Sequence, residues 1–342
     1  MSKSRTLFWS GCMAAILAAC EGGAAHAESK ETILYSFANA TGKTPMTGLV
    51  MDISTGAFYG ATWQGGANGD GVIYQLLPPT PPATKWTYSV IYNSTFLHTN
   101  LAAANGVVYV SADGSGGACV NGSDCGAIFS LTPPIAGGGD WTETRLYTFS
   151  FGADGAEPEG PLAMDGQGAL YGTAEIGGTH CAKFRGCGTV FKLSPPAVPG
   201  RPWSFSAVYH FQGGAGGQQP FNGVIYDKSG NLYGSAPLDY LSGKSLVFKL
   251  TPPSGAGDWT ESVLYKFYPT SNCYPSGPLA YSSGPLAIDS KGALYGVFSP
   301  YASGTTACSN TTNEYVFQLA PSQSDPNVWT KTFMRTHCCP VN

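Results

Sequence analysis

A short alternating apolar segment that ends in proline recurs along the chain, and it constrains the fold more than any other feature of the sequence. Its clearest form, at residues 188–196, reads GTVFKLSPP. The other four copies read GVIYQLLPP, GAIFSLTPP, SLVFKLTPP and EYVFQLAP, at residues 71–79, 126–134, 245–253 and 314–321. Alternation of this kind, bounded by glycine and proline, is typical of a β-strand. Five copies of one strand predict five copies of one structural unit.

Each copy lies in a longer repeat with the same markers. In the third repeat, residues 161–165 and 169–174 are predicted strands joined by a turn, residues 189–193 form the third strand, and Trp203 opens a fourth. A tyrosine marks every second strand and a tryptophan opens every fourth strand: Tyr59, Tyr109, Tyr171, Tyr233 and Tyr295, then Trp86, Trp141, Trp203, Trp259 and Trp329.

Four short antiparallel strands per repeat predict an all-β fold, a β-propeller of five four-stranded blades. A lone sheet of short strands cannot bury both of its faces, whereas sheets stacked around an axis cover one another. The sequence therefore predicts a single domain over residues 28–342, with repeats at approximately 45–93, 99–149, 158–211, 220–267 and 276–336.

Two segments compete to close this ring. Residues 31–37 match the fourth-strand pattern but precede the first repeat, and residues 329–336 read as the fourth strand of the last repeat. The sequence thus predicts closure by an N-terminal or a C-terminal strand without deciding between them.

Four short patterns follow one another in these repeats. They are Pro-x-x-Gly-Leu at residues 45–49, Asp-x-x-Gly-x-Leu-Tyr-Gly-Thr at 165–173, Gly-Gly at 177–178 and Gly-Thr-Val-Phe-x-Leu at 188–193. Together they resemble the GloVer-type tandem repeat of exported bacterial proteins, over roughly residues 31–337. The second repeat departs from the pattern, with Val110 in place of the glycine. The resemblance implies a propeller-like exported protein, and it transfers no catalytic residue.

Residues 1–27 have the features of an export signal. Lys3 and Arg5 precede an apolar segment at residues 7–19 that is too short to span a bilayer comfortably. Cleavage after Ala-His-Ala at 25–27 would release a soluble protein, whereas the preceding Leu-Ala-Ala-Cys resembles a lipobox, in which Cys20 is lipidated. Both alternatives predict an exported protein, in the periplasm, at the cell surface or outside the cell.

Eight cysteines follow the signal region: Cys119, Cys125, Cys181, Cys187, Cys273, Cys308, Cys338 and Cys339. An even number in an oxidising compartment favours disulfides. In a propeller, the loops after the second strands and the loops between blades share one face, and all eight cysteines are predicted to lie there. Because Cys119–Cys125 and Cys181–Cys187 have the same spacing in equivalent loops, each pair is predicted as a local disulfide. The pairing among the last four stays open.

Few side chains outside these patterns suggest ligand binding. Asp154, Glu157 and Glu159 cluster in a predicted interblade loop, where they could bind Ca²⁺. EF-hand spacing is absent, and a solvated acidic loop is the simpler interpretation. Four loop aromatics are candidates for contacting sugars: Trp63, Tyr240, Tyr274 and Tyr301. The acids before the tight turns are expected to bond the backbone instead: Asp52, Asp165, Asp227 and Asp289.

Composition and motifs limit the function. The 17 Lys+Arg are scattered and the net charge is -4, so no basic surface for nucleic acid is expected. The sequence has no Gly-x-Ser-x-Gly elbow, phosphate loop or His-Glu-x-x-His motif, and no metal-ligand spacing. It predicts a monomeric exported module without a cofactor, which holds a glycan or a protein partner on the disulfide-braced face. The membrane would be reached only through a lipid anchor. Two alternatives stay open: a polysaccharide hydrolase or lyase using Asp154 and Glu157, and a structural envelope protein.

Overall fold

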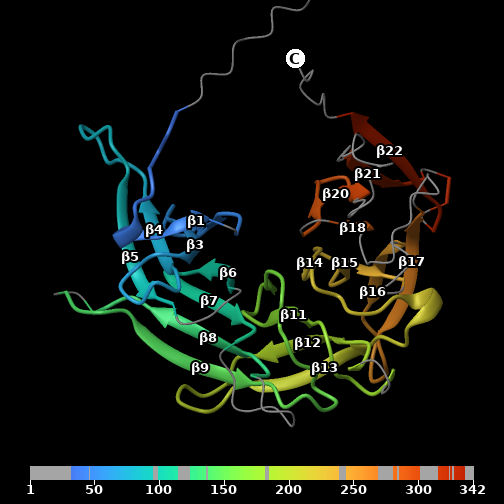
Figure 1. Ribbon diagram of the computed structural model, residues 1–342. Coiled ribbons are helices and arrows are strands. Elements are labelled where there is room, and N and C mark those ends of the chain that lie inside the picture. Colours follow the sequence, from blue (N-terminus) through green and yellow to red (C-terminus); the bar gives the residue numbers. More distant parts are fainter. Residues whose placement is uncertain are drawn as a thin grey trace, which may run out of the picture. The chain divides into compact units, whose positions relative to one another are not determined.

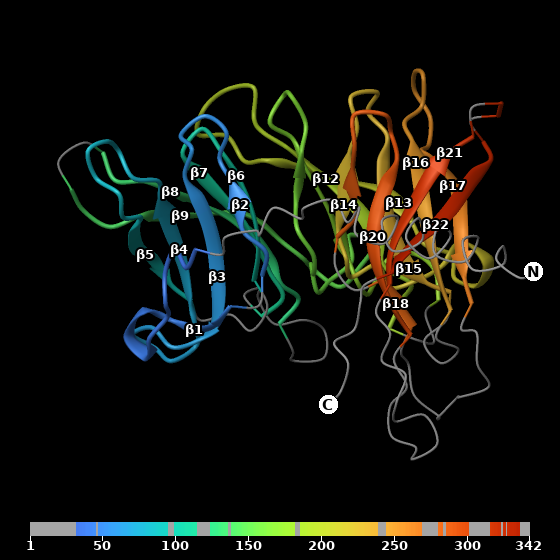
Figure 2. The same ribbon diagram turned by 90° about the horizontal axis from the view of Figure 1, so that it is seen from above.

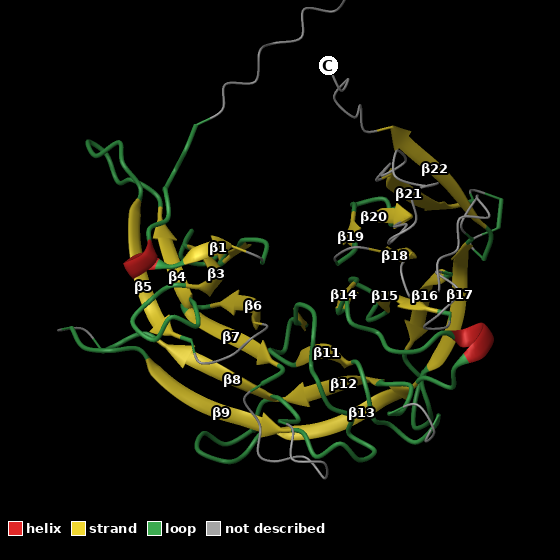
Figure 3. Ribbon diagram, in the orientation of Figure 1, coloured by secondary structure: helices red, strands yellow, loops and turns green. Residues whose placement is uncertain are grey.

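The computed structural model describes residues 32–45, 47–94, 99–114, 124–135, 138–181, 185–238, 244–268, 280–282, 285–300, 315–322, 324–325 and 327–335. The chain divides into two parts, Met1–Ser36 and Phe37–Asn342, and residues 32–36 are all that is described of the first. In the described residues, the second part consists of strands and loops apart from two helical turns, η1 (Asn39–Thr41) and η3 (Gly214–Gly216) (Figure 3). No helix in these ranges is long and apolar enough to cross a membrane. The predicted all-β fold is confirmed.

The strands form five antiparallel sheets, numbered in chain order (Figure 1). Sheet 1 contains β1 (Lys43–Pro45), β2 (Val50–Met51), β3 (Phe58–Gln64), β4 (Val72–Leu77) and β5 (Thr87–Asn93). Sheet 2 contains β6 (Thr99–Ala104), β7 (Val107–Ala112), β8 (Ala127–Thr132) and β9 (Thr142–Thr148). Sheet 3 contains β10 (Ala163–Met164), β11 (Leu170–Ala174), β12 (Thr189–Ser194) and β13 (Ser204–His210).

The last two sheets repeat this order. Sheet 4 contains β14 (Val224–Tyr226), β15 (Leu232–Pro237), β16 (Ser245–Thr251) and β17 (Thr260–Phe267). Sheet 5 contains β18 (Ala280–Ser282), β19 (Ala287–Ile288), β20 (Leu294–Pro300), β21 (Tyr315–Pro321) and β22 (Trp329–Arg335). In sheets 1 and 5, two short segments share the place of the first strand, since β1 and β2 both pair with β3, and β18 and β19 both pair with β20. Pairing among the described strands stays within each sheet, and β22 is the fourth strand of sheet 5.

The core is divided among the interfaces between successive sheets. Buried side chains form four apolar clusters, and each cluster draws on two neighbouring sheets. The second-strand tyrosine of one sheet meets the tryptophan of the next, with ring centroids 6.0–6.3 Å apart: Tyr59 with Trp141, Tyr109 with Trp203, Tyr171 with Trp259, and Tyr233 with Trp329. The two aromatic markers of the repeat therefore recur together because they are partners across each interface.

A second aromatic contact repeats where the fourth strands end. Three phenylalanines at this end pack on a third-strand phenylalanine of the next sheet: Phe149 on Phe191, Phe211 on Phe248, and Phe267 on Phe317, at centroid distances of 5.2, 5.2 and 4.8 Å. The three third-strand side chains are 0 % exposed. The phenylalanine of the Gly-x-Val-Phe pattern is thus an anchor of the interface.

The glycine that follows the second-strand tyrosine makes room for this anchor. Gly172 lies opposite Phe191 in the ladder between β11 and β12. A Cβ atom at Gly172 would lie 2.5 Å from Cζ of Phe191 and 2.8 Å from Cδ2 of Leu162, closer than packed atoms approach. Gly234 and Gly296 meet the phenylalanine of their own sheets at the same 2.5 Å. The repeated Tyr-Gly pattern is therefore a packing requirement.

Replacing Gly172 with alanine is expected to lower the free energy of unfolding by about 1–3 kcal/mol, the usual cost of overpacking a core. The added methyl group must displace Phe191, which Phe149 holds from the neighbouring sheet. Denaturant unfolding of the purified variant measures the change. Gly166→Ala is the matched control, because nothing lies within 4 Å of a Cβ atom at Gly166. Equal stability of the two variants would contradict the packing role.

Aspartates hold the tight turns between first and second strands, as the sequence predicts. Oδ1 of Asp165 accepts hydrogen bonds from two backbone amides of its turn, both at 2.9 Å, and the hydroxyl of Tyr171 donates to Oδ2 at 3.2 Å. Asp227 and Asp289 repeat all three bonds. The pKa of Asp289 lies below its usual range, chiefly because of the hydrogen bond from the Ala293 amide. These carboxylates are committed to the turns.

Candidate functional site

The strands of the sheets run between two sets of loops (Figure 2). The loops after the second strands and the loops that join successive sheets are hydrogen-bonded to each other. The amide of Glu175 donates to the carbonyl of Glu157 at 3.0 Å, and the amide of Gln218 donates to the carbonyl of Pro237 at 2.8 Å. Both kinds of loop therefore share one end of the sheets, which we call the loop face. The aspartate turns lie at the other end.

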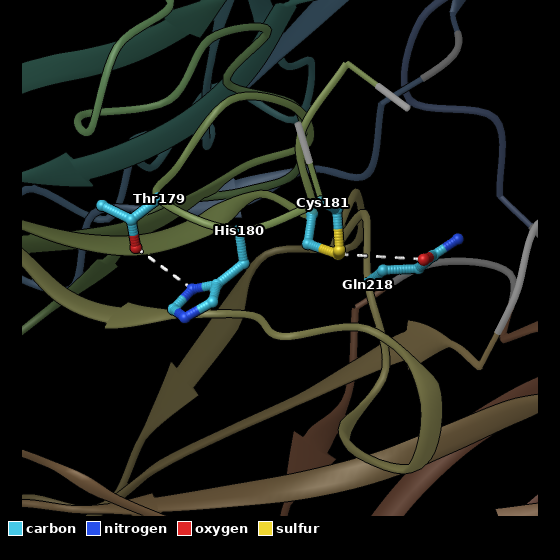
Figure 4. Close-up of a disulfide and its surroundings, with 5 residues drawn as sticks. Thr179, His180, Cys181 and Gln218 are labelled. Atoms are coloured by element: carbon cyan, nitrogen blue, oxygen red, sulfur yellow. Dashed lines mark hydrogen bonds between the residues drawn. A yellow bond between two sulfur atoms is a disulfide. The ribbon is translucent and has the colours of Figure 1, made fainter. Parts of the chain in front are cut away.

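A disulfide joins Cys181 to Cys187 on the loop face, with the Cα atoms 5.3 Å apart (Figure 4). Sγ of Cys187 lies 3.8 Å from Oε1 of Gln218, and this is a contact rather than a hydrogen bond because a disulfide sulfur carries no proton. The amide of Gln219 donates to the carbonyl of Cys187 at 2.7 Å. The disulfide thus braces the loop of sheet 3 against the segment that enters sheet 4, and it is typical of proteins from oxidising compartments.

Most of the remaining predicted cysteines and tyrosines lie outside the residues that the structure describes. Cys125 is also disulfide-bonded, and its predicted partner Cys119 lies outside the described residues. The same is true of the other predicted positions: Cys20, Cys273, Cys308, Cys338, Cys339, Tyr240, Tyr274 and Tyr301.

Asp154 organises the loop between sheets 2 and 3. Its Oδ1 accepts hydrogen bonds from Oγ of Ser150 (2.7 Å) and the amide of Gly152 (3.0 Å). Its Oδ2 accepts from the amide of Ser150 (2.8 Å) and the hydroxyl of Tyr147 (3.0 Å). Both carboxylate oxygens are therefore engaged in holding their own loop.

Glu157 differs from Asp154, because its carboxylate pairs with a side chain from another loop. Arg185, from the loop after β11, forms an ion pair with Oε1 of Glu157. Glu157 has a positive φ of 54°, a left-handed conformation. Its amide donates a hydrogen bond to the carbonyl of Cys125, and its carbonyl accepts one from the amide of Glu175. The ion pair connects the loop between sheets 2 and 3 to the loop after β11 on the loop face.

One position of the repeat reaches the loop face in every sheet, four residues after the second-strand tyrosine and at or just after the end of the second strand. It holds Trp63, Asp113 and Glu175 in the first three sheets, and Pro237 and Ser299 in the last two. Trp63 lies in β3 and is 41 % exposed. Asp113 directly follows β7, and Glu175 directly follows β11. The repeat thus brings an indole and two carboxyl groups to equivalent places on three successive sheets.

Glu175 is the strongly perturbed acid of this group. Its pKa is raised to about 7, chiefly by burial and then by the negative charges of Glu159 and Glu157, with a smaller contribution from Asp113. The guanidinium of Arg185 opposes the rise. A carboxyl group with this pKa is partly protonated near neutral pH, so it can donate as well as accept a hydrogen bond.

Sequence reasoning missed Glu175 and Asp113, because neither belongs to a motif read along the chain. The signal that could have found them is the repeat itself. Aligning the five repeats at their second-strand tyrosines places both acids in the same column as Trp63.

Two histidines on the loop face, His180 and His210, lie near each other. Nδ1 of His180 lies 3.1 Å from Oγ1 of Thr179 (Figure 4). Burial and the neighbouring His180 lower the pKa of His210, whose buried Nδ1 has no hydrogen-bond partner among the described residues. Within the described part of the chain, no group of three or more His, Cys, Asp or Glu side chains could hold a metal ion.

The fold and the loop face define an all-β repeat protein with disulfide-braced loops at one end of its sheets. The Gloeobacter/Verrucomicrobia repeat matches residues 24–180 and 93–308, so the chain belongs to this repeat family. The predicted resemblance is thereby confirmed. No sequence among the curated proteins matches the chain significantly.

Several solved structures are similar to this chain at low identity. An ulvan lyase bound to a -[GlcA(1-4)Rha3S]- sugar is 11% identical, with a TM-score of 0.47 and coverage of 86% of this chain and 74% of the lyase. A gluconolactonase from Xanthomonas campestris is 13% identical, with a TM-score of 0.39 and coverage of 73% and 67%. An exo-1,5-alpha-L-arabinanase from a bovine ruminal metagenomic library is 12% identical, with a TM-score of 0.38 and coverage of 88% and 100%. Likeness at these levels does not extend to function.

Proposed function

We propose that the loop face is a carbohydrate-binding surface centred on Trp63, Asp113 and Glu175. The observation that carries the proposal is their placement: an exposed indole and two carboxyl groups occupy one position of the repeat, at the ends of the second strands of neighbouring sheets. Sites for small polar ligands combine an apolar or aromatic surface with a few fixed polar groups. A sugar ring presents both an apolar C–H face and hydroxyl groups, and this combination suits it.

The charges around Glu175 favour an uncharged ligand. The Glu157–Arg185 ion pair neutralises one of the nearby carboxylates, and partial protonation of Glu175 removes part of another charge near neutral pH. A protonated carboxyl group donates one hydrogen bond and still accepts others, as a hydroxyl-rich ligand requires. The disulfide between Cys181 and Cys187 keeps the adjoining loop in place.

Screening the exported protein on a glycan array, followed by calorimetric titration of the sugars it binds, tests this function. Glu175→Ala and Trp63→Ala are each expected to weaken binding about 10-fold or more, the order of magnitude for losing one hydrogen bond or packing contact to a ligand. Asp140→Asn is the control, because Asp140 is exposed in a loop at the opposite end. Unchanged affinity in both site variants, or binding to no glycan, would contradict the proposal and favour a protein partner or a structural role.

A second candidate function rests on the acid chemistry of Glu175. A partly protonated carboxyl group is suited to act as a general acid, and glycoside cleavage needs a second carboxylate beside it. Asp113 is the candidate, because its charge acts on Glu175. Release of reducing ends from a bound polysaccharide, lost in Glu175→Gln and Asp113→Asn, would establish a hydrolase or lyase. A bound polysaccharide that stays intact over long incubation would leave binding alone.

We also propose that the five sheets are the blades of one β-propeller, with the loop face on one side. Three features support this: the shared strand order, the aromatic contacts from each sheet to the next, and the repeat family. The disulfide supports a role outside the cytoplasm. Mass analysis of the mature N-terminus distinguishes lipidation at Cys20 from cleavage after Ala27.

A further inference from the structure

The face of sheet 1 that points away from sheet 2 differs from the equivalent faces of the other sheets. One first-strand position demonstrates this. Leu101, Leu162, Val224 and Leu286 are 2–7 % exposed in sheets 2 to 5, whereas their equivalent Leu49 is 48 % exposed in sheet 1. The preceding sheet covers the position in sheets 2 to 5. Sheet 1 therefore presents an apolar face built to be covered.

Sheet 5 has the complementary feature on its opposite face. The third-strand position that faces the next sheet is 0 % exposed in sheets 1 to 4, at Ile73, Ile128, Val190 and Val247. Its equivalent Val316 in sheet 5 is only half-buried. Sheet 5 thus presents the other half of an interface.

The aromatic contacts between sheets stop at these two faces. Tyr295 is the second-strand tyrosine of sheet 5, and among the described residues it meets no tryptophan. Trp86 opens the fourth strand of sheet 1 and packs instead on Phe58 of its own sheet, with centroids 5.6 Å apart. In the part of the chain that the structure describes, Tyr295 and Trp86 are therefore the two members of the repeated pair without a partner from another sheet.

The start of the second part of the chain supplies another element of this interface. Phe37 packs on Tyr74, the third-strand aromatic residue of sheet 1, with centroids 5.1 Å apart. This is the contact that the last phenylalanine of a fourth strand makes with the next sheet. Residues 35–37 read Tyr-Ser-Phe, like the Tyr-x-Phe ends of earlier fourth strands, whereas residues 335–337 of the last one read Arg-Thr-His. The Tyr-x-Phe sequence that is missing from the fourth strand of sheet 5 therefore occurs in the chain directly before sheet 1.

We propose that these two faces pack on each other within one chain, with Trp86 on Tyr295 and Leu49 buried between the sheets. The proposal rests on the five-bladed arrangement proposed above, and it names the seam of that ring. The occupant is the other end of the same chain, because the residues that replace the missing Tyr-x-Phe belong to that end. The N-terminal segment need not replace β22 as the fourth strand of sheet 5. Phe37 instead contributes to the interface from sheet 1, on which it packs.

A charge placed at Leu49 tests the seam. Leu49→Asp is expected to lower the Tm of the full-length mature protein by at least about 5 °C more than Ile53→Asp, because a carboxylate buried between two sheets lacks a partner. Ile53 is the matched control, since it lies in the same sheet and is 88 % exposed. Scanning calorimetry measures both shifts. Similar shifts for the two variants would overturn the proposal.

If Leu49→Asp does not fold, a double-mutant cycle on Trp86 and Tyr295 tests whether these two side chains are in contact. Trp86→Ala and Tyr295→Ala are expected to be non-additive in Tm, as Trp329→Ala and Tyr233→Ala should be for a pair in contact. Additive shifts for Trp86 and Tyr295 would overturn the seam. Light scattering measures the mass of the protein in solution. A monomer with non-additive Tm shifts supports packing of the two faces within one chain. A dimer with non-additive Tm shifts would show that the faces pack between two copies, and this would overturn the proposal. These stability readouts do not depend on sugar binding, so failure of the proposed function leaves them intact.

Discussion

Replacing Phe191 with alanine is expected to lower the free energy of unfolding by about 3–5 kcal/mol, the usual cost of removing a buried phenylalanine from a core. Phe191 is 0 % exposed, and its ring centroid lies 5.2 Å from that of Phe149 and 6.0 Å from that of Phe205. Both neighbours belong to strands or strand ends whose backbones are held in hydrogen-bonded sheets. The surrounding atoms therefore cannot collapse to fill the space, and most of the cavity persists.

Denaturant unfolding of Phe191→Ala, compared with Phe333→Ala, checks this expectation. Phe333 is 41 % exposed on β22, so its removal opens no closed cavity, and a change of less than about 1 kcal/mol is expected there. Comparable losses in the two variants would show that the third-strand phenylalanine is not the anchor of the interface.

Glu175→Gln is expected to stabilise the folded protein at pH 8 by up to about 3 kcal/mol and to leave its stability at pH 4 nearly unchanged. The pKa of Glu175 is raised from 4.5 to about 7 in the folded chain, chiefly by burial. Between these two values the folded state holds a proton that the unfolded state has released. Stability therefore falls as the pH rises through this window, and the loss is complete above the folded pKa. Glutamine stays neutral and does not incur this loss.

The free energy of unfolding measured from pH 4 to pH 8 gives the result. The wild-type curve is expected to fall relative to that of Glu175→Gln between about pH 4.5 and pH 7. Asp140→Asn serves as the control for removing an exposed acid at the other end of the sheets. Parallel curves for the wild type and Glu175→Gln would show that Glu175 titrates at an ordinary pKa, and the general-acid function would lose its support.

Much of the fold could be predicted from the sequence, because the same pattern of strands and turns occurs five times along the chain. The third strand is the clearest case: the alternation at residues 188–193 predicts a strand, and β12 (Thr189–Ser194) forms there. Asp165 before its tight turn was expected to bond the backbone, and it does. The spacing of Cys181 and Cys187 predicted their disulfide. In each case the cause lies within a few residues along the chain.

The candidate site was harder to predict, because its residues come together only when sheets stack. Asp154 and Glu157 stood out as acids in one loop, yet Asp154 is engaged by hydrogen bonds inside that loop. Glu175 has an ordinary local sequence, and its raised pKa comes from burial and from charges on other loops. Nor does the sequence say that Tyr171 and Trp259 touch, since that depends on which sheet covers which face.

The position shared by Trp63, Asp113 and Glu175 has a consequence for how such proteins diversify. The residues that join one sheet to the next lie within the strands and at the ends of the fourth strands, whereas this position stands at the end of a second strand, outside the repeated aromatic contacts. Natural selection can therefore exchange its occupant in one repeat while the others, and the stack itself, are kept. In a repeat protein of this kind, the residues that stabilise the stack of sheets can stay the same while the residue at this loop-face position changes in one repeat.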